Sequence, residues 1–399
     1  MSEVTADALL AALRRHIAWQ ERQGPLSQDQ YDIWAGGLGR RAKRRFYEGR
    51  VGGRLACAPL VAVDALVPRA RRWLRRPTRF AIADAHYAMG HLALRGALDG
   101  PARLRAADEA LTALRASRSP AEADLCWGYP FDWVTVWGTW PAGTPLVTTT
   151  PYVYEAFEAH VAAIGDDASR EAMRSIARWA YERLTQAEVA LGVAATSYSP
   201  RDDRRVVNAS AYRGFLLLSA GRTFANEEWR TAARENLSFV LHSQRPDGSW
   251  LYAVDGKDAF IDNFHTCFVI KNLVKAFALD GDDDLLAAAR RGYAFYKRAL
   301  LDSYGLPRPF ALTQRANLVR RELYDFAEGV NLALLMRDHD DTAEFILEEL
   351  LRALLSAWQL PDGHFVTRRT LLGRNAVPYH RWAQSQVFRA LALVAAERG

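Results

Sequence analysis

The sequence has few cysteines and no long apolar run. Its 399 residues include three cysteines, Cys57, Cys126 and Cys267, and no CxxC pair. A sparse, odd set of this kind is not that of a disulfide framework and is typical of a reducing compartment. No stretch of 18 apolar residues occurs, so we expect no membrane span. The N-terminal residues are charged and amphipathic, unlike a secretion signal, and we therefore expect a cytoplasmic protein.

The excess of charge of one sign is also small. The chain has 52 Lys and Arg against 46 Asp and Glu, a formal charge of +6. Because this excess is modest for the length, we expect no nucleic-acid partner. A mildly basic surface does suit an anionic substrate. Strand signals are weak as well, and only residues 146–150 (LVTTT) and 249–254 (SWLYAV) are expected to form short strands at the rim.

The sequence does contain a repeating helical pattern. From the second helix onward the apolar helices are spaced by about 57 residues, the length of one helical hairpin with its loops. More charged, amphipathic helices lie between them. A helix surrounded by core loses its polar face, whereas an outer helix keeps one. The pattern predicts an all-α (α/α)6 barrel, a toroid of six helical hairpins whose inner helices begin near Phe80, Pro151, Val207, Asn263, Leu323 and His380.

The whole chain, residues 1–399, is predicted to form this single toroid domain. Residues 1–75 form an N-terminal helical segment that completes or flanks the ring. Two stretches compete for the outer helix of the first pair, residues 4–22 and residues 57–75, and the sequence leaves both open.

The connections between helices fall into two classes. Those from an inner helix to the following outer helix are short, while those from an outer to the next inner helix are long and rich in aromatic residues, Gly and Pro. In a ring of antiparallel hairpins all the long connections reach the same rim, where functional sites usually lie. The N-termini of the inner helices face this rim and favour anions.

Polar residues recur where the inner helices begin. Asp262 and His265 are three residues apart, so they share a helix face and could transfer protons as an Asp–His pair. With His380 they suit abstraction of a proton beside a carboxylate, the chemistry of uronate lyases and epimerases. Asp325 and Glu328 with Asp262 could instead provide the paired carboxylates of a glycoside hydrolase. Helix capping is the structural alternative for Asp262 and Asp325. The predicted catalytic residues are Asp262, His265, Asp325 and His380.

Aromatic residues crowd the loop CWGYPFDW, residues 126–133. Flat rings stack on the apolar faces of pyranoses, and the alternative is a rigid plug in the barrel mouth. Together with polar positions on the inner helices, the loop supplies the predicted substrate-binding residues, which are Trp127, Tyr129, Asp132, Trp133, Tyr152, Asn208, Tyr212, Trp250, Glu328 and Arg381.

A zinc set could be drawn from Asp262, His265, Cys267 and His380. Cys267 is two residues from His265, however, and on a helix it points elsewhere. We therefore predict no metal and no cofactor.

A turn motif occurs twice, 115 residues apart. SQRPDGSW (residues 243–250) and WQLPDGHF (residues 358–365) resemble the Q-x-x-x-G-x-W repeat of terpene cyclases. Each combines a helix C-terminus, a Pro-Asp-Gly turn and an aromatic residue that packs back between hairpins. The motif predicts a stabilising device rather than a reaction.

The strings CWGYPFDW, TPLVTTTPYVYEAF, DGSWLYAVDG and FIDNFHTCFVIKNL resemble bacterial proteins found with polysaccharide-biosynthesis genes. Their fold is similar to the six-hairpin glycosidases and the terpenoid-cyclase toroids, and the resemblance runs from roughly residue 30 to the end. Members are often labelled δ-aminolevulinic acid dehydratase. That enzyme is a TIM barrel, and the alternation of strands and helices it requires is not visible here. The resemblance implies a carbohydrate-active protein of surface-polysaccharide metabolism.

Three functions follow as hypotheses. The first is a hydrolase, lyase or epimerase that acts on a glycan or sugar nucleotide, with an acidic sugar favoured by the basic charge. The second is a terpenoid-cyclase-like or prenyltransferase-like enzyme on a polyisoprenoid, which needs a deep apolar cavity. The third is a non-catalytic glycan-binding toroid, whose barrel mouth would be filled.

Overall fold

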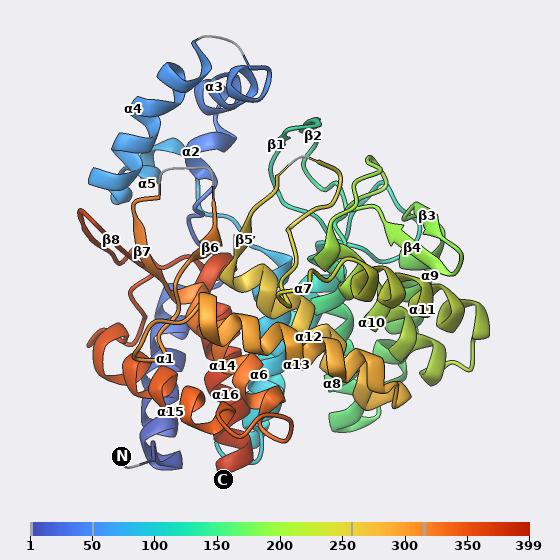
Figure 1. Ribbon diagram of the computed structural model, residues 1–399. Helices are drawn as coiled ribbons and strands as arrows, with labels where there is room; N and C mark the ends of the chain where they lie inside the picture. The colour runs from blue at the N-terminus through green and yellow to red at the C-terminus, as the bar shows by residue number, and fades with distance from the viewer. Residues whose placement is uncertain (1–2, 50–51, 257, 314–316) are drawn as a thin grey trace.

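The computed structural model describes residues 3–49, 52–256, 258–313 and 317–399. Figure 1 shows a ring of helices with the strands and long connections on one side and both termini on the other. Within the described residues, the six predicted inner helices are present as α6 (Ala81–Leu94), α8 (Thr150–Ile164), α10 (Val207–Thr223), α12 (Asn263–Asp280), α14 (Leu323–Met336) and α16 (Ser385–Arg398).

The inner helices form a closed ring, because each packs on the next and α16 packs on α6. Their burial explains their composition, since α10 is buried at every position from Val207 to Gly221. The ring closes tightly at Gly90 of α6. A Cβ atom there would lie 2.6 Å from the ring of Phe388 on α16, so only glycine fits this approach. The (α/α)6 barrel is confirmed.

The outer helices are amphipathic, and at several of them the side chain of the N-cap residue accepts a hydrogen bond from the first turn. The carboxylates of Asp99, Asp166 and Asp282 and the amide oxygen of Asn226 accept backbone N–H groups in the first turn. Five of these helices follow their inner partners along the chain. They are α7 (Gly100–Ala116), α9 (Asp167–Glu182), α11 (Glu227–His242), α13 (Asp283–Ala299) and α15 (Ala343–Ala353).

The sixth outer helix is α1 (Ala6–Gln23), which packs against α16. The repeated turn motif shows why. Gln244 donates from Nε2 to the carbonyl of Ala288 on α13 at 2.9 Å, and Gln359 donates likewise to Ala12 on α1 at 2.8 Å. The two turns therefore bind α13 and α1 in the same way. Of the two stretches left open by the sequence, residues 4–22 correspond to the ring helix.

The glycines of the two motifs explain this packing. Gly248 and Gly363 have φ angles of +88° and +105°. A Cβ atom would lie 2.4 Å from the carbonyl oxygen of Arg291 at Gly248, and 2.1 Å from that of Arg15 at Gly363. Both positions thus need glycine for backbone conformation and for close approach. The motif acts as the stabilising device that its sequence predicts.

Short strands lie at the rim, but not at the positions that the sequence predicts. Residues 146–150 form turns leading into α8, and residues 249–254 contribute only an isolated bridge between Val206 and Ala253. Both strand predictions are wrong. The observed antiparallel pairs are β1 (Trp133–Thr135) with β2 (Gly138–Trp140), β3 (Gln186–Ala190) with β4 (Val193–Thr196), and β5 (Ile261–Asp262) with β6 (Phe310–Leu312); β7 (Val319–Glu322), β8 (Arg368–Thr370) and β9 (Gly373–Asn375) form a three-stranded sheet.

The connection from α1 to α6 is the longest and carries its own helices. These are α2 (Asp32–Ala35), α3 (Gly37–Tyr47), α4 (Gly53–Leu66) and α5 (Arg71–Leu74). They stand above the rim outside the ring, in blue at the upper left of Figure 1. Residues 57–75, the second candidate for the ring helix, belong to this excursion. No helix of the described residues has both the length and the apolar character to cross a bilayer.

Candidate functional site

The mouth of the barrel contains a cavity of about 230 Å³, which we call the mouth pocket. It is smaller than the ~300–1,000 Å³ of drug-sized ligand sites and suits one sugar ring. Long rim connections and the end of α3 line it. Its aromatic side chains are Tyr47, Tyr129, Trp133, Trp137, Trp140, Tyr198, Tyr252, Phe260 and Trp382, and its charged or titratable groups include Arg204, Asp258 and His265.

The aromatic wall is held rigid by contacts between rings. Trp133 faces Trp140 across the β1–β2 hairpin with ring centroids 5.3 Å apart, and Tyr129 lies 5.3 Å from Trp133. Tyr198 lies 6.0 Å from Trp133 on the other side. Trp127 is fully buried and donates from Nε1 to the carbonyl of Leu114 at 2.8 Å. The loop therefore provides both a buried plug and a lining.

Asp262 and His265 form a hydrogen-bonded pair at the wall of this pocket. The Asp262 carboxylate caps α12 by accepting from the backbone N–H of His265 at 3.1 Å. It also contacts His265 Nδ1 through both oxygens, at 2.8 and 2.7 Å. Asp262 is buried, whereas 20% of the His265 side chain is exposed. When Nδ1 donates to the carboxylate, Nε2 has a free lone pair, so the pair has the arrangement of a general base and its orienting carboxylate.

One arginine at the pocket forms ion pairs with two aspartates. Arg204 donates to Asp255 at 3.2 Å and to Asp258 at 3.1 Å. Its guanidinium lies 5.5 Å from the centroid of Tyr252, whose ring is 4.6 Å from that of His265. A cation is thus fixed on the same side of the pocket as the histidine.

Asp325 lies buried below the pocket and does not line it. Neither of its carboxylate oxygens has a hydrogen-bond partner among the described residues. Burial raises its pKa well above the usual value, and the nearby charges of Glu322 and Asp262 add to the rise. Burial thus favours the neutral form of the Asp325 carboxyl over the charged form. It is not placed as the second carboxylate of a hydrolase.

The lumen deeper in the ring contains buried ion pairs. Lys271 is paired with Glu328, and Glu155 accepts from both Lys275 and Arg389 at 2.9 Å. Burial alone would raise the pKa of Glu155, but the two cations outweigh it and hold the value at about 2. We call Glu155, Lys271, Lys275, Glu328 and Arg389 the lumen network.

Tyr152 and Tyr212 belong to the lumen as well. Their hydroxyls are 2.7 Å apart, and both side chains are buried. Together with Glu328 they were predicted to bind substrate, but the structure places all three in the lumen, away from the mouth pocket. The two hydroxyls bond to each other between α8 and α10.

His380 and Arg381 also lie apart from His265. His380 Nδ1 contacts the Tyr87 hydroxyl at 2.7 Å and Nε2 contacts the Gly24 carbonyl at 3.0 Å. Burial lowers the pKa of His380 to about 4. Both ring nitrogens are therefore used internally, and we do not retain His380 in the catalytic set. Arg381 binds both oxygens of Asp29, at 2.7 and 2.5 Å, which directs it away from any ligand.

Arg381 still affects the pocket indirectly. Its guanidinium lies 4.6 Å from the centroid of Tyr129 and 4.8 Å from that of Trp382, both of which line the cavity. It therefore positions two aromatic walls.

The remaining predicted ligand contacts divide between structural and peripheral positions. Trp250 is buried and donates from Nε1 to Val240, as part of the turn motif. Asp132 is paired with Arg40 at the rim. Asn208 is buried beside Asp262 and His265 around a void of about 10 Å³, which has room for roughly one water molecule. Tyr129 and Trp133 do line the mouth pocket.

Several residues of the pocket were not indicated by sequence patterns. Tyr252, Asp258 and Phe260 belong to the string SWLYAVDGKDAFID just before Asp262, so their proximity to His265 could have been inferred from chain position. Tyr47 and Trp382 are brought to the pocket by tertiary packing alone.

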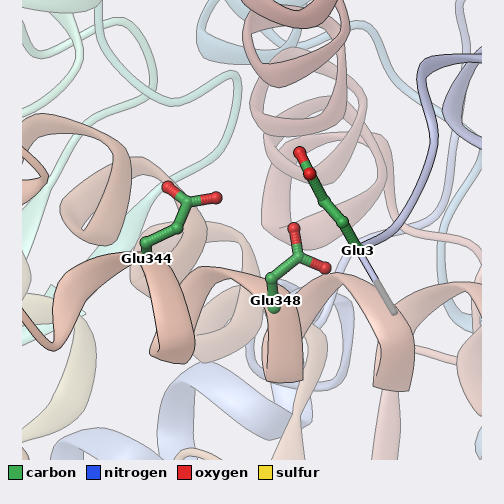
Figure 2. A group of neighbouring side chains, drawn as sticks. All are labelled: Glu3, Glu344 and Glu348. Carbon is green, nitrogen blue, oxygen red and sulfur yellow. The ribbon is translucent and has the colours of Figure 1, made fainter. Parts of the chain in front are cut away.

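The zinc set drawn from the sequence is not assembled. His380 contacts Tyr87 and Gly24 as described, and Cys267 lies 3.6 Å from the amide oxygen of Asn263. Figure 2 shows Glu3, Glu344 and Glu348, which alone among the described residues bring three potential ligand atoms together. This cluster is remote from the mouth, and Arg398 pairs with Glu344 at 2.9 Å and Glu348 at 2.6 Å. The cluster is thus an ion-pair network at the surface.

A larger cavity of about 910 Å³ lies outside the ring between α1 and α7. It is an open gap between two outer helices, floored by Ala83, Asp84 and Tyr87 of α6. Asp108 of its lining pairs with His160 at 2.9 Å, but that histidine is buried and does not line the cavity. The mouth pocket therefore remains the candidate site despite its smaller size.

No protein-family model matches the chain, and no curated protein matches its sequence. Solved structures do match. Cellobiose 2-epimerase from Bacillus thermoamylovorans is 9% identical with a TM-score of 0.63, and the match covers 80% of this chain and 88% of that one. A D-mannose isomerase is 12% identical with a TM-score of 0.61, covering 80% and 87%. A family 88 glycosyl hydrolase from Bacteroides vulgatus is 10% identical with a TM-score of 0.60, covering 99% of both chains.

The chain is an (α/α)6 toroid. The likeness extends over most of each matched structure and agrees with the closed ring described above. At these identities it establishes the fold of the toroid, and the chemistry has to be argued from the mouth pocket itself.

Proposed function

We propose that this toroid is a carbohydrate-active enzyme that transfers a proton at a sugar carbon next to a carbonyl or carboxylate group, as an epimerase, isomerase or lyase does. The observation that carries the proposal is the Asp262–His265 pair at the wall of an aromatic cavity of one-sugar size. The aromatic rings support a pyranose, and the helix N-termini that face the rim favour an acidic glycan or a sugar nucleotide.

His265 is the proposed base. Its Nε2 lone pair forms an N–H bond as the substrate C–H bond breaks, and the electron pair moves to the adjacent carbonyl oxygen to give an enolate. Asp262 stabilises the imidazolium that results and keeps Nδ1 protonated throughout. Protonation of the enolate on its opposite face completes an epimerisation, return of the proton by His265 to the original face regenerates the substrate, and loss of a β-substituent as the enolate collapses completes an elimination.

A hydrolase with two carboxylates is less well supported. Such enzymes need an acid and a second carboxylate about 5–9.5 Å apart around the bond to be cleaved. Asp325 and Glu328 are buried beneath the pocket, and Glu328 is paired with Lys271. Of the carboxylates near the cavity, Asp262 is bonded to His265 and Asp258 to Arg204.

The other two hypotheses are less well supported too. A polyisoprenoid cyclase needs an apolar tunnel, but the lumen contains the ion pairs of Glu155 and Glu328. A purely binding toroid would share the aromatic pocket but would not need the Asp262–His265 pair.

The proposal can be tested by hydrogen exchange. The protein is incubated in D₂O with reducing disaccharides, aldoses, uronic-acid oligosaccharides and sugar nucleotides, and deuterium at the carbon beside the carbonyl is followed by NMR. We expect exchange with at least one class and its loss in His265→Ala. His242→Ala is the matched control, because His242 is an exposed histidine on α11 outside the site.

Three results would count against the proposal. Exchange that survives in His265→Ala would remove the proposed base. Glycan binding by thermal shift without any exchange or cleavage would favour the binding toroid. Stabilisation by prenyl diphosphates and by none of the sugars would favour the cyclase.

A further inference from the structure

The positive charge of the chain is concentrated in one segment of the excursion between α1 and α6. Residues 37–79 contain thirteen Lys and Arg but only two Asp and Glu, a formal charge of +11. The rest of the chain has 39 basic and 44 acidic residues, a formal charge of −5, so the overall +6 conceals two regions of opposite sign. Among the side chains of this segment that the structure describes, six arginines are exposed, namely Arg41, Arg44, Arg45, Arg54, Arg69 and Arg76.

The same segment exposes a row of apolar side chains. On α4, Leu55, Pro59, Ala62 and Leu66 follow one another at intervals of four, three and four residues, so they lie on one helix face. All four are exposed, with Leu55 at 77% and Leu66 at 67%. An ordinary surface helix buries such an apolar row, whereas α4 exposes it to solvent.

Neighbouring elements extend the apolar surface. Trp73 and Leu74 of α5 are 72% and 48% exposed, and Leu38 of α3 is 77% exposed. In Figure 1, α3, α4 and α5 project together from the rim side of the barrel. Exposed Leu and Trp side chains beside arginines are the composition of segments that lie in the interface of a bilayer.

We propose that α3, α4 and α5 dock the chain on an anionic membrane surface. The row from Leu55 to Leu66 enters the interfacial region between head groups and acyl chains, together with Trp73. Arg41, Arg45 and their neighbours bind the anionic head groups. Because Tyr47 at the end of α3 also lines the mouth pocket, docking holds that pocket near the lipid head groups. The proposal does not depend on the reaction assigned to His265.

Charge decides between a membrane and the other occupants of an apolar surface. A second copy of the chain would present the same strongly positive segment, and the two faces would repel each other. A nucleic acid would match the arginines but not the exposed leucines, which have no counterpart on a phosphate backbone. An anionic bilayer matches both features.

The test is flotation of the full chain with vesicles. Phosphatidylcholine vesicles are compared with vesicles that also contain phosphatidylglycerol, at low and high salt. We expect binding only with phosphatidylglycerol and a loss at high salt. Replacing two arginines in Arg41→Gln/Arg45→Gln should weaken binding about thirtyfold, and Leu55→Ser/Leu66→Ser should weaken it at least tenfold.

Matched controls come from the opposite side of the molecule. Ile164, at the end of α8 away from the rim, is 53% exposed, and Arg170 is exposed on α9. Ile164→Ser and Arg170→Gln should bind vesicles like the wild type, and circular dichroism should show that all variants are folded.

Several outcomes would overturn the proposal. They are equal binding to both kinds of vesicle, no binding of the wild type, or wild-type affinity in Leu55→Ser/Leu66→Ser. A dimer in sedimentation that dissociates in the leucine variant, without vesicle binding, would identify a second copy as the occupant. Binding to duplex DNA that is lost in the arginine variant, with vesicle binding absent, would identify a nucleic acid.

Discussion

The mouth pocket and the lumen are built by the same inner helices but use their polar residues differently. In the lumen, Glu155 is held by Lys275 and Arg389, so its charge is neutralised inside the protein. At the mouth, Asp262 binds only one of the two ring nitrogens of His265, and the histidine remains partly exposed beside a cavity.

This difference shows how a polar residue in a barrel becomes a candidate for chemistry. Each oxygen of Glu155 accepts from one cation, so this carboxylate holds helices together and has no unbonded oxygen to offer a ligand. A pair with one unused nitrogen beside a cavity can act on a substrate. Variants of the lumen network should therefore lose stability, whereas variants of the Asp262–His265 pair should lose activity.

Breaking the lumen network should have the largest effect. In Glu155→Ala, Lys275 and Arg389 lose their shared partner while still buried, so we expect the free energy of unfolding to fall by about 3–5 kcal/mol. Urea denaturation measures the change. The control is Glu397→Ala, which removes the exposed ion pair between Arg337 and Glu397. This variant should lower the free energy of unfolding by less than about 1 kcal/mol. A similar cost for both pairs would mean that the lumen is hydrated.

Asp262→Asn should separate capping from proton transfer. Asparagine is as good an N-cap as aspartate, so the stability of α12 should change little. The imidazolium of His265 would lose its carboxylate, and turnover should fall roughly a hundredfold or more. Asp282 caps α13 in the same manner, and Asp282→Asn should leave both stability and turnover unchanged. If Asp262→Asn retains full turnover, Asp262 is a cap only.

The pH dependence of stability should report on the buried imidazole of His380. The pKa of His380 is about 4 in the folded protein and near 6.5 in the unfolded chain. Between these values the unfolded state binds more protons, so the free energy of unfolding falls by up to about 1.4 kcal/mol for each unit by which the pH is lowered.

A variant measures this contribution. His380→Gln lacks the titrating group and should show a shallower decrease of unfolding free energy between pH 6.5 and 4. Asp32 and Asp84, whose pKa values burial raises to about 6, act in the opposite direction in both proteins and cancel in the comparison. Identical slopes would mean that His380 is accessible to water.

Removing one aromatic wall should have the smallest effect. Trp133→Ala deletes a stacking surface of the mouth pocket and should weaken glycan binding by about 0.5–1.5 kcal/mol, up to roughly tenfold in Kd. Calorimetry with the best substrate of the exchange screen measures it. Trp229 on α11, which is remote from the pocket, gives the comparison, since Trp229→Phe should leave binding unaltered. An equal loss in both variants would show a general effect on stability.

Much of the fold could be predicted because it depends on local periodicity. The inner helices are apolar on every side, whereas the outer helices are apolar on one side only. This contrast is visible in the sequence before any contact is known. The pairing of Asp262 with His265 was predictable for the same reason, because residues three apart meet on a helix.

The rest of the site depended on contacts between distant segments. His380 and Asp325 have the same sequence context as His265, at the start of an inner helix. His380 is nevertheless enclosed by Tyr87 and Gly24, and Asp325 is buried under the pocket. No local pattern indicates which of these side chains faces the cavity, because that depends on how the rim loops cover each helix end.

The sequence by itself determined the number of hairpins, their inner and outer order and the rim at which the long loops gather. These follow from helical periodicity and chain connectivity, which are local properties. Only the tertiary structure decided that α1 closes the ring, that the aromatic loop is part plug and part lining, and that His265 faces a cavity while His380 does not. These outcomes depend on packing between segments up to several hundred residues apart, as in the contact of His380 with Gly24, which is 356 positions away in the chain.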